Sequence, residues 1–295
     1  VPRRCAQPAG VQVRRGGQRA GRRALGAAEL TLDGTVATPV VGLGDGIRNI
    51  STMLNITRTW NAAMSASGMR RAMALVQDYA RRRVAFGAPL QDKPLHQETL
   101  ADMQAEFEAG FVLAFRVVQL LGRVERRTAS ADEQQLFRVL TPLAKLTTGK
   151  QVVAVTSEAL EACGGAGYVE DTGLPMLLRD AQVLPIWEGT TNVLSLDVLR
   201  AAASVDVLHL IRQECTAQLA AVQDPGLAAC RTAVHASLRD VGEWLARTST
   251  DPQAIEAGAR ALSLSLGRTL CLALLTGHAQ WCLDHGRGGR SAAAA

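Results

Sequence analysis

Apolar residues from about position 50 onward recur at three- and four-residue intervals, which is the spacing of one buried face of an α-helix. In residues 50–83 the pattern includes Met53, Ile56 and Trp60 and ends in three arginines, which suit the negative end of a helix dipole. The same period predicts further helices over 94–127, 132–163, a segment that opens after Glu188, 205–222, 226–249 and 252–285. Seven helices joined by short connections predict an all-α fold, a helical bundle.

The segment before the helices has a different pattern. Residues 29–41 alternate apolar and polar positions around Asp33-Gly34, a dipeptide that favours a tight hairpin turn. Because an isolated hairpin is only marginally stable in water, we interpret these strands as the remnant of a larger sheet. Residues 1–28 show no apolar period and are expected to be disordered. Residues 166–188 contain glycines and prolines and are expected to form a loop.

The charge and composition refine this organisation. Ala, Leu and Arg are abundant and aromatic residues make up only 4%, which favours helices. The net charge of +5 arises from residues 1–28, which hold seven arginines and no acid. Such a segment is usually a solvated tail, and contact with nucleic acid is the less common alternative. The expected parts are a basic disordered tail (1–28), a remnant of a β-domain (29–46), a helical domain (47–203), a helical extension (204–285) and a disordered tail (286–295).

Several classes of protein are not expected. No apolar run reaches the roughly 20 residues that cross a bilayer, and no secretory signal stands near the start. We therefore expect a cytoplasmic protein without membrane contact. The six cysteines form no CxxC pair, which favours reduced thiols and no metal site.

Two motifs could hold a phosphate-bearing ligand. Arg81-Arg82-Arg83, followed by Phe86-Gly87, places guanidinium donors beside an aromatic ring at a helix end, where they could bind a pyrophosphate. A solvated helix terminus is the alternative. Cys163-Gly164-Gly165-Ala166-Gly167-Tyr168 allows the backbone to approach a ligand closely, and a plain helix C-cap is the alternative.

A third motif, Ile186-Trp187-Glu188-Gly189-Thr190, contains one carboxylate between apolar residues and a glycine. A carboxylate in such surroundings is typical of a general base. The residues are equally compatible with an acid at the start of the next helix, where carboxylates are common.

In their order and spacing, these motifs resemble those of the acyl-CoA dehydrogenase family. The family's Arg-x-x-Phe-Gly motif is matched by Arg83, Phe86 and Gly87, and its Gly-Gly-x-Gly-Tyr motif by Gly164, Gly165, Gly167 and Tyr168. Its Arg-Asp-Ala and (Tyr/Trp)-Glu-Gly-(Thr/Ser) motifs are matched by Arg179-Asp180-Ala181 and Trp187-Glu188-Gly189-Thr190. Over residues 30–200 the resemblance implies the family's C-terminal helical domain. The helical tail after residue 200 is similar to that of the AidB-like branch of alkylation-response proteins.

The resemblance implies an FAD-dependent oxidoreductase that introduces an α,β double bond into an acyl-CoA thioester. Glu188 corresponds to the base that takes the α-proton, while a hydride passes from the β-carbon to the flavin. Asn55, Ile56 and Thr57, where some relatives carry the base, offer no carboxylate. Arg58 and Gly189 correspond to substrate contacts. The corresponding FAD contacts are Arg83, Ala85, Phe86, Glu161, Gly164, Gly165, Thr190 and Asn192, of which Glu161 departs from the family's usual glutamine.

The family shares each flavin across a subunit interface, so the resemblance implies a dimer or a homotetramer. It also implies electron-transfer flavoprotein or oxygen as the electron acceptor. The family's N-terminal helical domain and most of its β-domain have no counterpart here, so a truncated form is expected. Two alternatives stay open: a DNA-associated flavoprotein of the alkylation response, for which Arg231, Arg239 and Arg247 offer a stripe of positive charge, and an inactive helical fragment.

Overall fold

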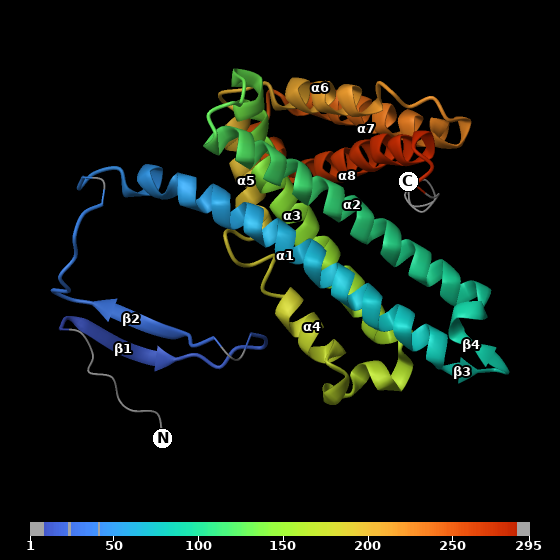
Figure 1. Cartoon of the computed structure of the whole chain (residues 1–295). Helices are drawn as coiled ribbons and strands as arrows, with labels where there is room; N and C mark the ends of the chain where they lie inside the picture. Colours follow the sequence, from blue (N-terminus) through green and yellow to red (C-terminus); the bar gives the residue numbers. More distant parts are fainter. Residues whose placement is uncertain (1–8, 23–24, 41, 288–295) are drawn as a thin grey trace. The chain divides into compact units, whose positions relative to one another are not determined.

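The computed structural model describes residues 9–22, 25–40 and 42–287, and 73% of these residues are helical. The chain divides into two compact units, Val1–Met53 and Leu54–Ala295. The predicted all-α fold is confirmed, with eight α-helices among the described residues where seven were expected (Figure 1).

The first unit contains a β-hairpin that differs from the predicted one. β1 (Val11–Gly16) pairs antiparallel with β2 (Ala28–Leu32). The expectation of a hairpin within residues 29–41 is therefore wrong. The expectation of disorder over residues 1–28 is wrong where β1 lies. Cys5 and the part of the expected C-terminal tail from residue 288 onward lie outside the described residues.

Hydrogen bonds to Gly10 explain the different pairing. The carbonyl of Gly10 accepts the backbone N–H of Asp33 (2.8 Å) and the hydroxyl of Thr35 (2.7 Å). The chain does turn at Asp33-Gly34. The residues at this turn hydrogen-bond to Gly10, and no second strand follows them among the described residues. Val11 and Val13, which alternate with polar neighbours, are the sequence signal for β1.

Three long helices form the main bundle: α1 (Gly46–Arg82), α2 (Pro94–Glu125) and α3 (Ala131–Ala162). They confirm the helices predicted from the apolar period. α3 begins with a capping box, in which the Ser130 side chain accepts the N–H of Glu133 and the Glu133 carboxylate accepts the N–H of Ser130.

Short elements connect these helices. The two-stranded hairpin of β3 (Val84–Ala85) and β4 (Ala88–Pro89) and the 3-10 turn η1 (Leu90–Asp92) join α1 to α2. After α3 come the 3-10 turns η2 (Gly164–Tyr168) and η3 (Glu170–Thr172).

A further helix, α4 (Leu174–Ala181), follows η3, so the expected loop over residues 166–188 is wrong in its middle. Gly173 and Pro175, which indicated a loop, are here the N-cap and a first-turn residue of α4. Proline suits that position because the first N–H groups of a helix have no partner within the helix.

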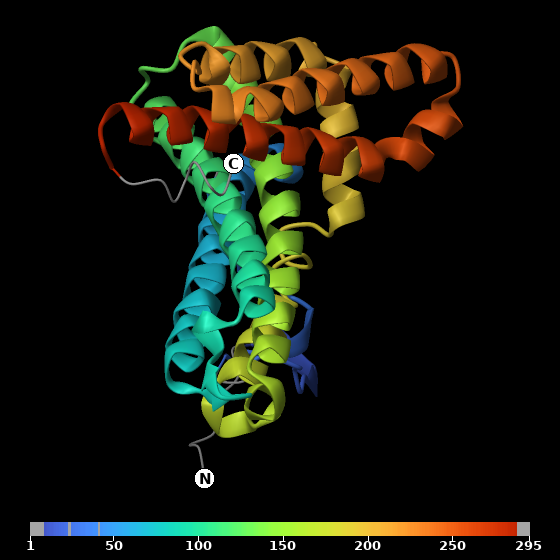
Figure 2. The ribbon, with the colours of Figure 1, turned by 90° about the vertical axis from the view of Figure 1, so that its right-hand side faces the viewer.

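The predicted helices after Glu188 are confirmed. They are α5 (Thr191–Ala202), α6 (Val207–Leu219), α7 (Ala228–Thr248, preceded by the 3-10 turn η4, Pro225–Leu227) and α8 (Pro252–Asp284). Figure 2 shows α6, α7 and α8 lying across one end of the bundle of α1, α2 and α3.

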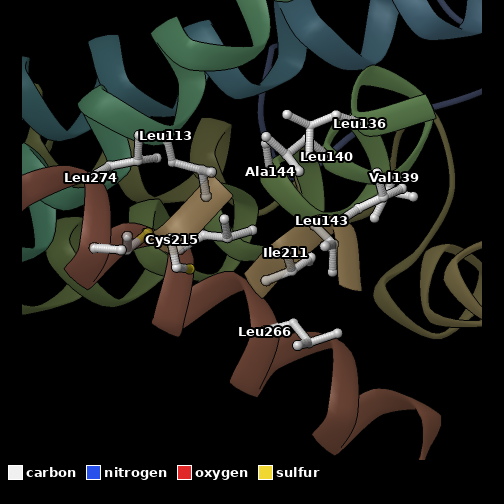
Figure 3. Close-up of a cluster of buried hydrophobic side chains, with 14 of the residues drawn as sticks. Leu113, Leu136, Val139, Leu140, Leu143, Ala144, Ile211, Cys215, Leu266 and Leu274 are labelled. Atoms are coloured by element: carbon white, nitrogen blue, oxygen red, sulfur yellow. The ribbon is translucent and has the colours of Figure 1, made fainter. Parts of the chain in front are cut away.

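Two clusters of buried side chains hold these helices together. One brings Leu113 of α2 and Leu140 of α3 together with Ile211 of α6 and Leu266 of α8 (Figure 3). The other joins α1, α2, α3 and α4 around residues such as Met73. α3 contributes buried residues to both clusters, so this helix is well packed along its length.

By length and composition alone, α8 could cross a membrane, but 61% of its most apolar stretch is buried inside the protein. It packs against α2, α3, α5, α6 and α7. This is the environment of a core helix, which passes the same test of length and hydropathy.

Candidate active site

Glu188 lies in the segment of residues 182–190 between α4 and α5, called here the Glu188 loop. The hydroxyl of Thr57 on α1 donates a hydrogen bond to Oε2 of Glu188 (2.7 Å). The Glu188 backbone is in the left-handed region (φ 60°), which a residue other than glycine keeps only where its surroundings hold it. The predicted base is therefore fixed through its side chain and through its backbone.

Arg58 holds this loop from α1. Its Nε donates to the carbonyl oxygen of Glu188 (3.1 Å), and its Nη2 forms an ion pair with Asp197 of α5 (2.8 Å). Only 14% of the Arg58 side chain is exposed, so its polar head is used within the fold. The substrate contact expected of Arg58 stays a prediction, and the structure shows that this arginine joins the Glu188 loop to α1 and α5.

Lys145 holds the loop from α3. Its side chain is fully buried, and Nζ donates to the carbonyl oxygen of Gly189 (2.5 Å). Burial and the positive charge of Arg58 lower the pKa of Lys145 from 10.5 to about 8, while the negative charge of Glu188 raises it. One turn along α3, a Cβ placed on Gly149 would lie 3.4 Å from Pro185, an ordinary van der Waals distance, so the loop packs directly against the helix.

The Glu188 loop also carries three N–H groups without a protein acceptor. Among the described residues, no hydrogen bond uses the backbone N–H of Glu188, Gly189 or Thr190. The carbonyls of Glu188 and Gly189 point to Arg58 and Lys145. Because the C=O and N–H of a trans peptide point in opposite directions, the N–H groups of Gly189 and Thr190 face away from these cations. Neighbouring N–H donors of this kind can bind an anionic oxygen.

Thr190 and Asn192 lie at the start of α5. Thr190 is the N-cap, and its hydroxyl accepts the N–H of Val193 (3.5 Å). Oδ1 of Asn192 accepts a hydrogen bond from Nη1 of Arg260 on α8 (2.8 Å), beside a groove of about 540 Å³. The helical extension thus brings a cation to a residue predicted to contact FAD, which sequence reasoning did not anticipate.

Arg83, Ala85 and Phe86 lie at the far end of α1, in and beside the β3–β4 hairpin. Phe86 and Gly87 both have positive φ (50° and 81°), as a two-residue hairpin turn requires. The Phe86 side chain is 97% exposed. The exposed Arg83 side chain forms no hydrogen bond or ion pair with the described residues. A cation and a ring are therefore both available to a ligand at this position.

Glu161, Gly164 and Gly165 lie at the end of α3. Gly164 has φ 57° and ends the helix, as the C-cap interpretation predicts. No atom lies within 4 Å of a Cβ placed on Gly164 or Gly165, whereas a Cβ on Gly167 would lie 1.9 Å from the carbonyl oxygen of Leu160. The two interpretations of this motif are therefore compatible, because Gly167 packs the turn while Gly164 and Gly165 stay open.

The predicted residues form two separate groups. Arg58 and the Glu188 loop lie along the first half of α1, whereas the β3–β4 hairpin follows its last residue. From Arg58 to Arg82, α1 extends about 36 Å at 1.5 Å per residue. The hairpin and η2 lie at the same end of the bundle in both views (Figures 1 and 2). One chain thus carries two groups of predicted ligand contacts at separate places in the bundle.

Sequence reasoning missed Thr57, Lys145 and Asp197 as parts of this site. Lys145 did have a signal, because it is the one charged residue in the otherwise uncharged run 139–149. Thr57 and Asp197 had none, since a threonine and an acid on helix surfaces are common. Among the described residues, no group of three or more His, Cys, Asp or Glu side chains could hold a metal ion.

Comparison with known proteins identifies the family. Residues 44–203 match the acyl-CoA dehydrogenase C-terminal domain, and residues 206–294 match a domain described as acyl-CoA dehydrogenase 11 C-terminal domain-like. The first match covers more than half of the chain, so the chain belongs to the acyl-CoA dehydrogenase family.

Two curated relatives are each 41% identical to this chain. Acyl-CoA dehydrogenase family member 11 of Caenorhabditis elegans matches over 277 residues, which is 92% of this chain and 45% of that protein. Putative acyl-CoA dehydrogenase AidB of Escherichia coli (strain K12) matches over 157 residues, which is 53% of this chain and 28% of that protein. The chain therefore spans less than half the length of either relative. The predicted family and its AidB-like branch are confirmed.

Solved structures show the same likeness. The crystal structure of Caenorhabditis elegans ACDH-11 in complex with C11-CoA has a TM-score of 0.90 at 39% identity, covering 97% of this chain and 49% of that one. An acyl-CoA dehydrogenase from Bacillus anthracis complexed with FAD has a TM-score of 0.79 at 19% identity, covering 97% of this chain and 53% of that one. This second likeness shows a shared fold.

Proposed function

We propose that this chain supplies the base-bearing helical domain of an FAD-dependent acyl-CoA dehydrogenase, which removes the α- and β-hydrogens of an acyl-CoA thioester. The observation that carries the proposal is the Glu188 loop. It presents a carboxylate bonded to Thr57 on a backbone that Arg58 and Lys145 hold. The complex of the Caenorhabditis elegans relative with C11-CoA supports a CoA thioester as the ligand.

In this proposal Glu188 takes the α-proton. Thr57 occupies Oε2, which leaves Oε1 to accept the proton. As the α C–H bond breaks, its electrons form the new C=C bond and the β-hydrogen leaves as hydride. FAD, when bound, supplies the hydride acceptor.

A thioester α-proton is too weakly acidic for an unassisted carboxylate, so the charge that develops on the thioester oxygen must be stabilised. The N–H groups of Glu188, Gly189 and Thr190 have no acceptor among the described residues and lie beside the base. They are available as donors to that oxygen. The base and the donors therefore belong to one loop.

The residues at the far end of the bundle fit a flavin nucleotide. Arg83 and Phe86 offer an unpaired guanidinium and an exposed ring. Gly164 and Gly165 offer open backbone. Glu161, an exposed acid nearby, disfavours a pyrophosphate at that point. We therefore assign the glycines to the adenosine part of FAD and Arg83 to its phosphates.

We further propose that two copies of the chain share each flavin, in a dimer or tetramer. The two groups of predicted contacts lie about 36 Å apart along α1, too far for one flavin nucleotide to bridge. Apolar surface for another copy is present, since Phe111 and Phe115 stack on α2 (centroids 4.5 Å apart) and Trp60 is 66% exposed.

The test is anaerobic mixing of the purified chain, loaded with FAD, with acyl-CoA thioesters of graded chain length. We expect the visible absorbance of the flavin to bleach. Glu188→Gln should lose this response, whereas Glu125→Gln, which changes an exposed acid at the end of α2, should keep it. A chain that binds no FAD, or whose flavin no thioester bleaches, would contradict the proposal.

The alternative of DNA binding receives no support from the arginines that suggested it. Arg239 and Arg247 both pair with Glu243, and Arg231 donates to the carbonyl of Val222. Glu243 therefore offsets part of the charge of Arg239 and Arg247, whereas Arg231 keeps its charge because its partner is a neutral carbonyl. The described cysteines are all free thiols, which supports the proposal of a reducing, cytoplasmic location. Electron-transfer flavoprotein or oxygen remains the proposed electron acceptor.

A further inference from the structure

The Glu188 loop is held by two cations that bind successive carbonyls. Arg58 donates to the carbonyl of Glu188 (3.1 Å) and also pairs with Asp197 (2.8 Å). Lys145 donates to the carbonyl of Gly189 (2.5 Å) from a fully buried position on α3. Among the described residues, the carbonyl oxygen of Gly189 is the one acceptor to which the Lys145 ammonium donates. The two cations therefore fix two adjacent peptide planes.

We propose that Lys145 is a positioning residue of the reaction, which holds the Gly189 carbonyl and thereby aims the N–H groups of the Glu188 loop at the thioester oxygen. This inference rests on the proposed function for the identity of that oxygen. It assigns Lys145 no proton transfer and no contact with the substrate.

The chemistry of the side chain supports this role. Lysine is rare in this chain, where Lys93, Lys145 and Lys150 are the only lysines among 32 Lys and Arg residues. Its compact ammonium is fully buried and presents one point charge to the Gly189 carbonyl. A buried ammonium without an acceptor is costly, so movement of Gly189 away from Lys145 is opposed.

The position of the Lys145–Gly189 hydrogen bond in the chain also supports this role. Lys145 binds the peptide that joins Gly189 to Thr190, the N-cap of α5. The N–H of Thr190 belongs to the same peptide plane and points away from Lys145. Gly189, at φ 107°, has no side chain that could fix this plane. Without Lys145, the plane would lose its one hydrogen bond to α3 and could rotate.

The test compares Lys145→Met, which keeps the length of the side chain without its donor, with Lys150→Met, which changes an exposed lysine on the same helix. The first readout is the ¹⁵N order parameter of the Gly189 and Thr190 amides in the full chain without ligand. We expect wild type and Lys150→Met to stay near 0.85 and Lys145→Met to fall below about 0.6. The second readout is steady-state turnover, where Lys145→Met should lower kcat roughly 10- to 100-fold with KM within about twofold.

A third readout needs only the wild type, in case Lys145→Met does not fold. The ¹³C carbonyl resonance of Gly189 should titrate together with the Cε resonance of Lys145. Independent titration of the two, or unchanged order parameters in a folded Lys145→Met, would overturn the inference. The order parameters and the carbonyl titration need no substrate, so they remain decisive if the proposed dehydrogenase activity fails.

Discussion

The titration of Lys145 offers a quantitative test of the buried cation in the Glu188 loop. Burial, followed by the positive charge of Arg58, lowers the pKa of Lys145 from the usual 10.5 to about 8, although the negative charge of Glu188 opposes this change. Arg58 faces Lys145 from α1, and Glu188 faces it from the loop. Removing either charge should therefore move the titration in a predictable direction.

The change in pKa gives the size of the effect on stability. Each pKa unit corresponds to about 1.36 kcal/mol, so holding a charged Lys145 in the folded state costs about 3 kcal/mol at neutral pH. The unfolded chain keeps the proton up to about pH 10.5, whereas the folded chain releases it near pH 8. The free energy of unfolding therefore rises between these two pH values. Relative to Lys145→Met, wild type should gain about 2 kcal/mol between about pH 7 and about pH 9.5.

The assay is ¹³C NMR of lysine-labelled protein, in which the three lysines give three Cε signals. We expect the signal of Lys145, assigned by its loss in Lys145→Met, to titrate near pH 8. Its pKa should fall in Glu188→Gln and rise in Arg58→Ala, because these variants remove the charges that raise and lower it. A midpoint near 10.5, or a stability difference from Lys145→Met that does not change with pH, would refute the reasoning.

Three further predictions concern contacts within the bundle. Gly267→Ala should lower the free energy of unfolding by about 1–3 kcal/mol, because the new Cβ would lie 2.0 Å from Oγ1 of Thr147 where α8 crosses α3. In urea unfolding, Gly122→Ala on α2 should instead stabilise by up to about 1 kcal/mol, since its Cβ meets open space. Arg116→Ala should cost about 3 kcal/mol, because it leaves the nearly buried carboxylate of Glu214 without its 2.8 Å partner. Equal stability of the two glycine variants, or a loss below about 1 kcal/mol for Arg116→Ala, would contradict these contacts.

The long helices could be predicted because each shows a clear apolar period. The turn around Asp33-Gly34 was recognised, but its partner was not, because the hydrogen bonds to Gly10 join residues more than 20 positions apart. α4 was missed for a different reason. Gly173 and Pro175 are breakers inside a helix but suitable residues at its start, and eight residues show too little of a period to decide.

Sequence reasoning identified Glu188 as the candidate base through its spacing from other family motifs. The structure places Glu188 on a loop whose carbonyls are hydrogen-bonded by Arg58 and Lys145. What surrounds Glu188 could not be predicted, because Thr57 and Lys145 lie 131 and 43 positions away in the sequence. Their closeness depends on how α1 and α3 pack. The length of α1 was predicted from its apolar period, but the distance between the Glu188 loop and the β3–β4 hairpin was not, because the apolar period does not place Glu188 beside Arg58.

The central claim, that Glu188 takes the α-proton, is tested most directly by deuterium exchange at the α-carbon of an acyl-CoA thioester. The FAD-loaded chain and the thioester are mixed in deuterated buffer without an electron acceptor, and the α-carbon is followed by NMR. We expect wild type and Glu125→Gln to incorporate deuterium, and Glu188→Gln to do so about 10²- to 10⁴-fold more slowly. Exchange in Glu188→Gln at the wild-type rate would contradict the account, because another group would then be removing the proton.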